Sequence, residues 1–560
     1  MAIGSLLLDR GDITRPQLDA ALAEQRISGE RLDRVLVRLG FVGRDRVLAA
    51  VGDQFHMPVV DLAGLTVDRS VLAALPATLV YKQRCVPIAR ENGTITVATS
   101  DPYEIAVLDE LRLLTGSSIE LVLADDEELH KFIRANYGVG GDTLDAMGAG
   151  GPAVEPKPGG KDDDADQAQE ASVIKLVNDL LAEAVAERAT DVHIEPYEHQ
   201  LNVRYRIDGV LQRANVPPSI HRFGAAILSR LKIMASLNIA EKRRPQDGRI
   251  SYRHRAQGAP AREYDLRLSI IPMLFGEGAV LRVLSKTTAL MSLGDLGMPE
   301  AVSTRWDRLI NRPHGIVLVT GPTGSGKSTT LYASLNRIVS DEIKVITVED
   351  PVEYHVSGIN QIQVNHKVGL DFAAGLRSIL RHDPDVVMIG EIRDKETAET
   401  AVQASLTGHL VFSTLHTNDA PGSITRLLDM GVEPFLVSSS LEGVLAQRLV
   451  RRVCAVCAAP YVPEAADLPD GLPLSPGQTL VRGAGCRDCR QTGYRGRVGV
   501  YELLTVTDET RAMVMDRVNA PALAAAALAR GDLSTLLEDG LAKVRAGHTT
   551  LHEVMSALSA

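Results

Sequence analysis

One stretch of the sequence has the residue types and spacing of a phosphate-binding loop. Residues 321–328 read GPTGSGKS, which matches the pattern GxxxxGK[ST]. Backbone N–H groups of such a loop converge on phosphate oxygens, the lysine reaches the β and γ phosphates, and the serine hydroxyl ligates Mg²⁺. An apolar strand expected over 316–319 and a helix expected over 329–338 supply the required context. The sequence therefore predicts a nucleotide site at Gly321, Pro322, Thr323, Gly324, Ser325, Gly326, Lys327, Ser328 and Thr329.

Carboxylates follow two further strands that we expect beside this loop. Glu349 follows a strand over 344–348, and Glu391 follows a strand over 385–389. The carboxyl ends of parallel strands share one edge of a sheet, so either glutamate could orient or deprotonate the attacking water, or hold Mg²⁺ through water. Gly390 stands where many such enzymes place Asp, which makes the metal more dependent on Ser328. Which glutamate is the base stays open at this point.

Two histidines flank a fourth expected strand over 410–414. They are His409 and His416. A lone histidine is usually structural, but two that flank a strand aligned with a nucleotide site could sense the γ-phosphate. We therefore treat both as candidate catalytic residues.

Four of the five cysteines form two CxxC pairs, with the pattern of a metal site. Cys454 and Cys457 make the first pair, and Cys486 and Cys489 make the second. Two thiolate pairs form a closed tetrahedral site that suits structural Zn²⁺. Cys85 stands alone in the apolar context CVPI, which favours a buried core thiol. Five cysteines in 560 residues do not make a disulfide framework.

Length and composition exclude several classes of protein. A chain of 560 residues with 45% apolar and 23% charged residues is expected to form several globular domains. The net charge of −11 disfavours a nucleic-acid partner. No apolar run approaches the roughly 18 residues needed to span a bilayer, and residues 1–10 lack the basic region of a signal peptide. We expect a cytoplasmic protein that contacts the membrane only through partners.

The pattern along the chain predicts four segments. Residues 1–137 form an N-terminal domain, in which 1–57 hold a helix–glycine–helix repeat offset by 29 residues and the rest is a compact α/β subdomain. Residues 138–170 are rich in Gly, Pro and Asp, which predicts a flexible acidic linker. Residues 171–288 form a second α/β domain. Residues 289–560 alternate strand and helix as in a parallel sheet, and end in a mainly helical region that holds the cysteine module 454–489.

Taken together, these motifs resemble the secretion ATPase family, in its GspE/PilB branch. The stretches GPTGSGKSTT, ITVEDPVEY, LRHDPDVVMIGEIRD and TGHLVFSTLHTND resemble the family's Walker A, aspartate box, Walker B and histidine box. The stretches ATDVHIEP, VRYRIDG, RRPQDGRI and YDLRLSIIP are similar to the domain before the motor. The resemblance covers about 171–560. It implies a RecA-like P-loop ATPase core, a homohexamer, and ATP bound between the two α/β domains and a neighbouring subunit.

The resemblance also assigns roles to arginines of the earlier domain. By motif position Arg267 in DLRLS and Arg282 in LRVL would reach the phosphates, as guanidinium groups do when they neutralise charge on a transferred phosphoryl group. Further candidates are Arg204, Arg206, Arg244 and Arg249. A regulatory module without turnover and a nucleic-acid translocase are competing readings. Intact Lys327, Glu349 and Glu391 weigh against the first, and the acidic charge weighs against the second.

Within the family, the tetracysteine module and the chain length are typical of assembly rather than retraction ATPases. The resemblance therefore implies type IV pilus assembly, with type II secretion as the alternative, and a polytopic inner-membrane platform protein as partner. The N-terminal repeat is similar to a domain that binds cyclic di-GMP in some relatives through RLGxxLxxxGxI motifs. Here the first motif lacks its arginine and Asp33 replaces a glycine of the second. Because a carboxylate repels phosphate, protein docking is favoured over cyclic di-GMP.

Overall fold

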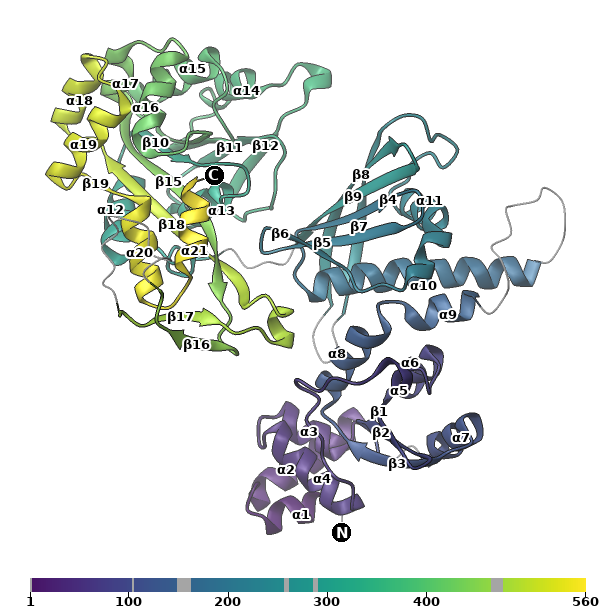
Figure 1. Ribbon diagram of the computed structural model, residues 1–560. Coiled ribbons are helices and arrows are strands. Elements are labelled where there is room, and N and C mark those ends of the chain that lie inside the picture. Colours follow the sequence, from purple (N-terminus) through teal and green to yellow (C-terminus); the bar gives the residue numbers. More distant parts are fainter. Residues whose placement is uncertain are drawn as a thin grey trace. The chain divides into compact units, whose positions relative to one another are not determined.

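The chain is divided into two compact units. The computed structural model describes residues 3–102, 105–148, 163–255, 261–285, 291–464 and 477–559 (Figure 1). The first unit is Met1–Leu284 and the second is Ser285–Ala560. The domain boundary predicted at 288/289 falls in residues 286–290, outside the described part of the chain.

The first unit begins with the predicted helix–glycine–helix repeat. Its helices are α1 (Ile3–Asp9), α2 (Arg15–Ser28), α3 (Leu32–Arg38) and α4 (Arg44–Phe55). Gly11 and Gly40 occupy equivalent turns and have φ angles of 73° and 70°, the left-handed conformation that favours glycine. The apolar stripes of the four helices pack on one another around Leu7 and Leu36, which are fully buried.

The α/β subdomain follows directly. It contains α5 (Arg69–Leu72), α6 (Ala77–Gln83), β1 (Cys85–Glu91), β2 (Thr94–Thr99), α7 (Ile105–Thr115), β3 (Ser118–Leu123) and α8 (Asp126–Tyr137). Strand β2 pairs antiparallel with β1 and parallel with β3. Cys85 is fully buried in the core of this subdomain, as its apolar neighbours predicted.

The predicted linker over 138–170 is wrong at both of its ends. Helix α9 (Gly141–Gly148) occupies its start, and α10 (Asp163–Ala186) begins before its end. Val139 and Leu144 are buried in the same core as Leu176 of α10, and the N–H of Val139 donates to the carbonyl of Asn215 at 2.7 Å. This packing orders a glycine-rich sequence that has little helix propensity of its own. Residues 149–162 lie outside the described residues.

The second domain of this unit is an antiparallel sheet with helices on one face. Its elements are β4 (Asp191–Pro196), β5 (Leu201–Ile207), β6 (Val210–Arg213), η1 (Pro218–Phe223), α11 (Gly224–Met234), β7 (Gln246–His254), β8 (Arg262–Met273) and β9 (Gly276–Ser285). The strand order is β6-β5-β4-β9-β8-β7. Alternate residues such as Val203, Tyr205 and Leu266 face α10 and α11 and form the core.

The second unit contains the predicted parallel sheet. Its elements up to residue 440 are η2 (Gly294–Leu296), α12 (Glu300–Ile310), β10 (Gly315–Thr320), α13 (Lys327–Ile338), β11 (Val345–Glu349), β12 (Ile359–Gln363), η3 (His366–Val368), α14 (Phe372–Ile379), β13 (Val386–Ile389), α15 (Lys395–Leu406), β14 (Leu410–Leu415), α16 (Ala420–Asp429) and α17 (Pro434–Ser440). Ile316 and Leu318 of β10 face one core, and Val317 and Val319 face the other, so helices cover both faces.

The C-terminal region contributes helices, as predicted, and also two long strands that were not expected. Its elements are β15 (Leu441–Val453), β16 (Ala458–Tyr461), β17 (Leu480–Gly483), η5 (Arg487–Cys489), β18 (Tyr494–Thr505), α18 (Asp508–Met515), α19 (Ala520–Arg530), β19 (Leu533–Ser534), α20 (Leu536–Arg545) and α21 (Leu551–Ser559). Strand β15 runs parallel to β10, and β18 pairs antiparallel with β15. The full order is β12-β11-β13-β14-β10-β15-β18-β19. Among the described residues, no helix is long and apolar enough to cross a membrane.

Candidate functional site

The phosphate-binding loop lies between β10 and α13, as predicted. Gly321, Gly324 and Gly326 have φ angles of 143°, 81° and 90°, which L side chains rarely adopt. A Cβ atom at Gly321 would overlap the backbone oxygen of Gln447, and one at Gly326 would lie 2.7 Å from the Gln447 Nε2 atom. The loop therefore needs glycine both for its backbone conformation and because β15 lies directly against it.

Lys327 is the first residue of helix α13, and its side chain folds back onto the loop. Its ammonium donates to the carbonyl oxygens of Gly321 at 2.8 Å and Pro322 at 3.0 Å. Burial lowers the pKa of Lys327 to about 8, although the nearby Glu391 carboxylate acts in the opposite direction. Ser328, beside it, is exposed. A phosphate would replace two neutral carbonyls with charged acceptors for this ammonium.

The hydroxyl of one loop residue, Ser325, is unsatisfied within the described residues. The Ser325 hydroxyl is buried and has no hydrogen-bond partner within the described residues. A buried hydroxyl of this kind costs free energy unless something satisfies it. Together with the exposed residue Ser328 and the positive-φ glycines, it fits a site that accepts a nucleotide phosphate and its Mg²⁺.

Glu391 and His416 meet beside the loop. Ile389, the last residue of β13, pairs with Ser413 of β14. The residues just beyond these two positions therefore lie close together. The His416 Nε2 atom is 2.9 Å from the Glu391 carboxylate, and Arg393 forms an ion pair with its other oxygen. Burial raises the pKa of Glu391, but the hydrogen bonds from Arg393 and His416 outweigh it and hold the pKa below its usual value.

Glu349, in contrast, is enclosed by its own hydrogen bonds. One carboxylate oxygen accepts from the Thr347 hydroxyl at 2.6 Å and from Gln361 Nε2 at 3.1 Å, and the other accepts from the Tyr332 hydroxyl. The residue is 4% exposed. Burial is the main cause of the raised pKa of Tyr332, and the Glu349 carboxylate is the second. The phenol therefore stays protonated and donates its hydrogen bond. In this conformation both oxygens of Glu349 are occupied.

His409 is not part of this cluster. It precedes β14, and its carbonyl accepts from Gly315 at the start of β10. Six residues of β14 separate it from His416, which corresponds to about 20 Å along a strand. Its Nδ1 atom lies 2.9 Å from the carbonyl of Ala404 near the end of α15. Within its own unit, His409 therefore lies at the edge of the sheet opposite the phosphate loop.

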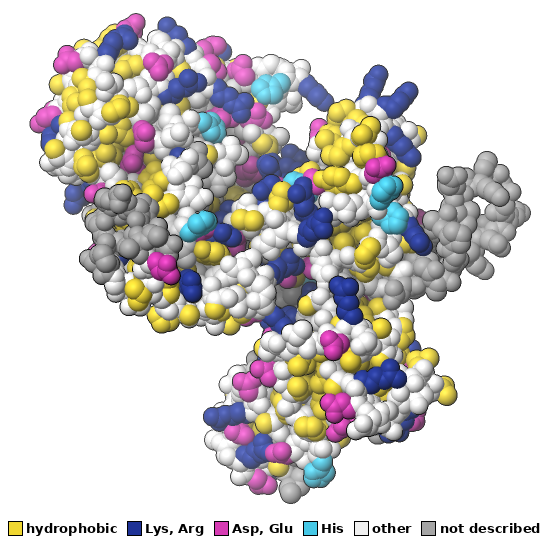
Figure 2. Space-filling model, viewed as in Figure 1, with side chains coloured by type: hydrophobic (Ala, Val, Ile, Leu, Met, Phe, Trp, Pro, Cys, Tyr) yellow, Lys and Arg dark blue, Asp and Glu magenta, His cyan; other side chains and the backbone are white. Residues whose placement is uncertain are grey.

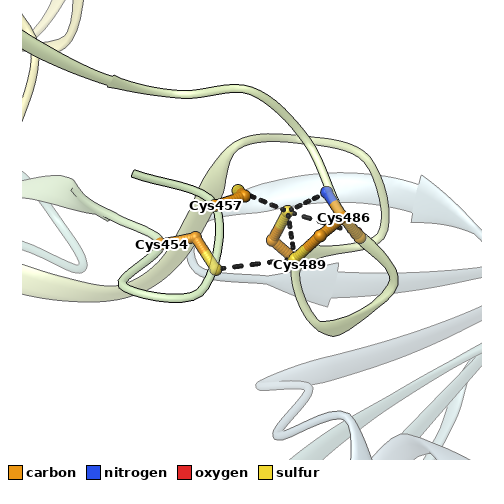
Figure 3. A group of neighbouring side chains, drawn as sticks. All are labelled: Cys454, Cys457, Cys486 and Cys489. Atoms are coloured by element: carbon orange, nitrogen blue, oxygen red, sulfur yellow. Dashed lines mark hydrogen bonds between the residues drawn. The ribbon is translucent and has the colours of Figure 1, made fainter. Parts of the chain in front are cut away.

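The four cysteines of the two CxxC pairs converge at the end of β15 (Figure 3). The Sγ atoms of Cys454 and Cys486 are 3.8 Å apart, those of Cys457 and Cys489 are 3.8 Å apart, and those of Cys486 and Cys489 are 3.6 Å apart. All four are free thiols. Zn–S bonds of about 2.3 Å in a tetrahedron place neighbouring sulfur atoms about 3.8 Å apart. The cluster thus has the ligand number and spacing of a tetrahedral thiolate site.

Comparison with known proteins agrees with this geometry. Residues 166–556 match the family described as Type II/IV secretion system protein. The chain belongs to this family. This secretion system protein is 43% identical to the type IV pilus assembly ATPase PilB of Myxococcus xanthus, over 99% of the chain and 98% of that protein. It is 42% identical to the type II secretion system protein E of Xanthomonas campestris, over 98% of the chain and 97% of that protein.

Two further matches concern the parts of the secretion system protein. Residues 55–143 match the MshEN domain family. The structure of the ATPase DotB of Yersinia pseudotuberculosis superimposes with a TM-score of 0.50 and 20% identity, over 72% of this chain and 96% of that one. That likeness agrees with the predicted RecA-like core and the α/β domain before it.

Apart from Arg244, the candidate arginines of the secretion system protein lie on one face of the six-stranded sheet β4–β9. Arg206 of β5 and Arg282 of β9 flank Asp191 of β4 in register, and Arg249 of β7 is opposite Arg267 of β8. Arg204 forms an ion pair with Glu195 at 2.6 Å on the same face, and Arg244 is exposed on the loop before β7. Figure 2 shows Lys and Arg side chains gathered where β5 and β6 lie. The other face of the sheet is the apolar core.

The sequence motifs did not single out four polar residues beside the phosphate loop, which are Thr320, Thr417, Arg448 and Gln447. The hydroxyl of Thr320, at the end of β10, lies 2.7 Å from that of Thr417, which follows His416. Arg448 of β15 is buried, and its guanidinium donates to the carbonyl of Asn418 at 3.0 Å. Burial lowers the pKa of Arg448. Gln447 lies under the loop itself. The sequence did not indicate a strand at β15, which carries Gln447 and Arg448, because the apolar residues there do not alternate with polar ones.

Proposed function

We propose that this secretion system protein is a hexameric, cytoplasmic P-loop ATPase that powers type IV pilus assembly at the inner membrane. The observation that carries the proposal is the phosphate loop with Lys327, next to the Glu391–His416 pair. The match to PilB along nearly the whole chain supports the choice of process. Type II secretion is the second candidate, because the Xanthomonas type II protein aligns over a similar length.

The roles of the side chains follow from their positions. Lys327 would bind the β and γ phosphates, and Ser328 would ligate Mg²⁺, which neutralises charge that develops on the phosphoryl group. Glu391 is the better candidate for orienting or deprotonating water, since it is half-buried near Lys327 and its only described side-chain partners are Arg393 and His416. Glu349 can act as the base only if its bonds to Tyr332, Thr347 and Gln361 open.

Arg267 and Arg282 are proposed to complete the site when the ring forms. Both belong to the first unit, whereas the loop belongs to the second. A guanidinium that reaches ATP from another domain, or from a neighbouring subunit, links hydrolysis to domain movement. This linkage is what a motor acting on a polytopic platform protein requires.

Zn²⁺ is the proposed ion of the tetracysteine cluster. Four thiolates with a tetrahedral spacing form a closed site without an open coordination position, which suits a structural ion. The ion would join the end of β15 to η5 and hold the β16–β17 hairpin. It has no proposed part in ATP hydrolysis.

The N-terminal domain is proposed to dock a protein partner, with cyclic di-GMP as the second candidate ligand because residues 55–143 match the MshEN domain family. Arg31 is the arginine of the second motif, and its guanidinium binds the carboxylates of Asp33 at 2.8 Å and Asp101 at 2.7 Å. Two carboxylates neutralise the charge that a phosphate would need. Titration calorimetry with cyclic di-GMP decides between the two candidates: absence of binding would support protein docking, and a micromolar Kd would assign the dinucleotide.

A chromosomal Lys327→Ala exchange separates the two candidate processes. Loss of surface pili with normal export of secreted enzymes would support pilus assembly. Loss of export with normal pili would assign the chain to type II secretion and overturn the first proposal. A parallel Arg253→Ala strain is a control, since Arg253 is an exposed arginine outside the proposed site.

A further inference from the structure

Gln447 lies against the phosphate loop at two glycines and is hydrogen-bonded to the helix that follows the loop. Its backbone oxygen lies 2.4 Å from where a Cβ atom at Gly321 would be, and its Nε2 atom lies 2.7 Å from where a Cβ atom at Gly326 would be. Its Oε1 atom accepts a hydrogen bond from the Thr330 hydroxyl at 2.7 Å. Gln447 is 1% exposed and Thr330 is fully buried. One residue of β15 thus spans the loop from its first glycine to the first turn of α13.

The register of β15 places Gln447 beside the phosphate loop. The strand is parallel to β10, and Ala446 is opposite Thr320, the last residue before the loop. Gln447 is therefore the first residue of β15 beyond the end of β10, where the loop turns away from the sheet. An apolar side chain here would fill the space but would leave the buried Thr330 hydroxyl without its acceptor, which is unfavourable.

We propose that Gln447 is a positioning residue for nucleotide binding, which fixes the phosphate loop in its observed conformation through its bond to Thr330. This inference rests on the proposed function, because it assumes that the loop binds ATP. Gln447 acts through the loop and has no proposed contact with the reacting atoms. A loop that is already ordered loses less entropy when it binds phosphate, so the bond should contribute to affinity more than to the chemical step.

The test is a double-mutant cycle on the full chain, with affinity for Mg²⁺·ATP measured by titration calorimetry and kcat and KM measured by phosphate release. Gln447→Met and Thr330→Val each remove one partner and keep the approximate shape. We expect each to raise Kd and KM about tenfold, with kcat changed less than threefold. The double variant should be no weaker than either single variant. Thr330→Ser keeps the hydroxyl and should restore the wild-type Kd.

Thr549 offers a matched control, because its hydroxyl bonds to the same strand, β15. Thr549 is fully buried and donates to the carbonyl of Arg451 of β15 at 2.8 Å, away from the loop. Thr549→Val should lower the unfolding temperature without changing Kd. Wild-type Kd in both single variants, or effects that add in the double variant, would overturn the inference. Should Gln447→Met fail to fold, Thr330→Val against Thr330→Ser decides the question. Wild-type chain that binds ATP without turnover would refute the proposed function alone.

Discussion

The His416 Nε2 atom lies 2.9 Å from the carboxylate of Glu391, although the two residues are 25 positions apart in the chain. The pairing of β13 with β14 brings them together, because both follow the carboxyl ends of neighbouring parallel strands. The histidine thus holds the carboxylate in one orientation beside the phosphate loop. A change in the charge around His416, such as the arrival of a γ-phosphate, would act directly on Glu391.

The two glutamates should respond differently to the same substitution. Glu391→Gln should keep ATP binding and lower kcat about 100-fold or more, since the amide retains the shape without the basicity. Glu349→Gln should lower the unfolding temperature, because the amide donates where the carboxylate accepts from Tyr332, Thr347 and Gln361, and should lower kcat less than tenfold. Phosphate release and thermal unfolding measure both. A larger loss of kcat in Glu349→Gln would make Glu349 the base.

Binding of ATP should take up protons in mildly alkaline solution. The pKa of Lys327 is about 8 without nucleotide, and phosphate oxygens raise it, so the empty site holds fewer protons than the filled site above pH 8. At pH 8.5 we expect uptake of about 0.7 proton for each ATP, and Kd should rise by up to about tenfold per pH unit. Calorimetry in two buffers of different ionisation enthalpy measures this uptake. Zero uptake at pH 8.5 would mean that Lys327 is already fully charged in the empty site.

Metal analysis tests the cysteine cluster. Freshly purified, reduced protein should contain about one Zn²⁺ per chain. Cys454→Ser should lose most of it and destabilise the C-terminal region, with Kd for ATP unchanged. Cys85→Ala is the matched control, because that cysteine is buried in the N-terminal domain, far along the chain from the cluster. The Cys85→Ala protein should contain as much zinc as the wild type. Metal content near zero in the wild type would reject the assignment.

Mixed rings test where the arginines act. Arg267→Ala should lose turnover while nucleotide binding largely survives, whereas Arg253→Ala, on the edge strand of the same sheet, should stay active. Lys327→Ala chains keep their arginines and Arg267→Ala chains keep their phosphate loop. Rescue of turnover on mixing would place Arg267 in the site of a neighbouring subunit. Absence of rescue in demonstrated mixed rings would place the contact within one chain.

Local sequence patterns located the phosphate loop and the cysteine pairs, but no local pattern located the ends of the predicted linker. The phosphate loop and the two CxxC pairs are local patterns, and the structure has the loop between β10 and α13 and the four thiols together. The hydrogen bonds that enclose Glu349 could not be predicted from the sequence. They come from Tyr332 and Gln361, which belong to other elements and meet Glu349 only in the folded chain. His409 and His416 flank β14 as expected, and only His416 lies at the end of the strand that the phosphate loop shares.

Strand β15 and helix α9 show two physical reasons for the missed elements. The apolar residues of β15 include Leu441, Val444, Leu445 and Leu449, a helical spacing, yet the strand is buried on both faces and need not alternate. Helix α9 has weak propensity of its own, and burial of Leu144 beside Leu176 compensates for it. Tertiary packing decided both elements, and no local pattern records it.

Phosphate release by the purified full chain, followed over a range of protein concentrations, tests the central claim most directly. If the chain is a ring-forming ATPase, turnover per chain should rise with concentration as rings assemble, and Lys327→Ala should remove nearly all of it at every concentration. Turnover that does not exceed that of Lys327→Ala at any concentration would contradict the account. Full turnover from a chain proven to be monomeric would contradict the ring.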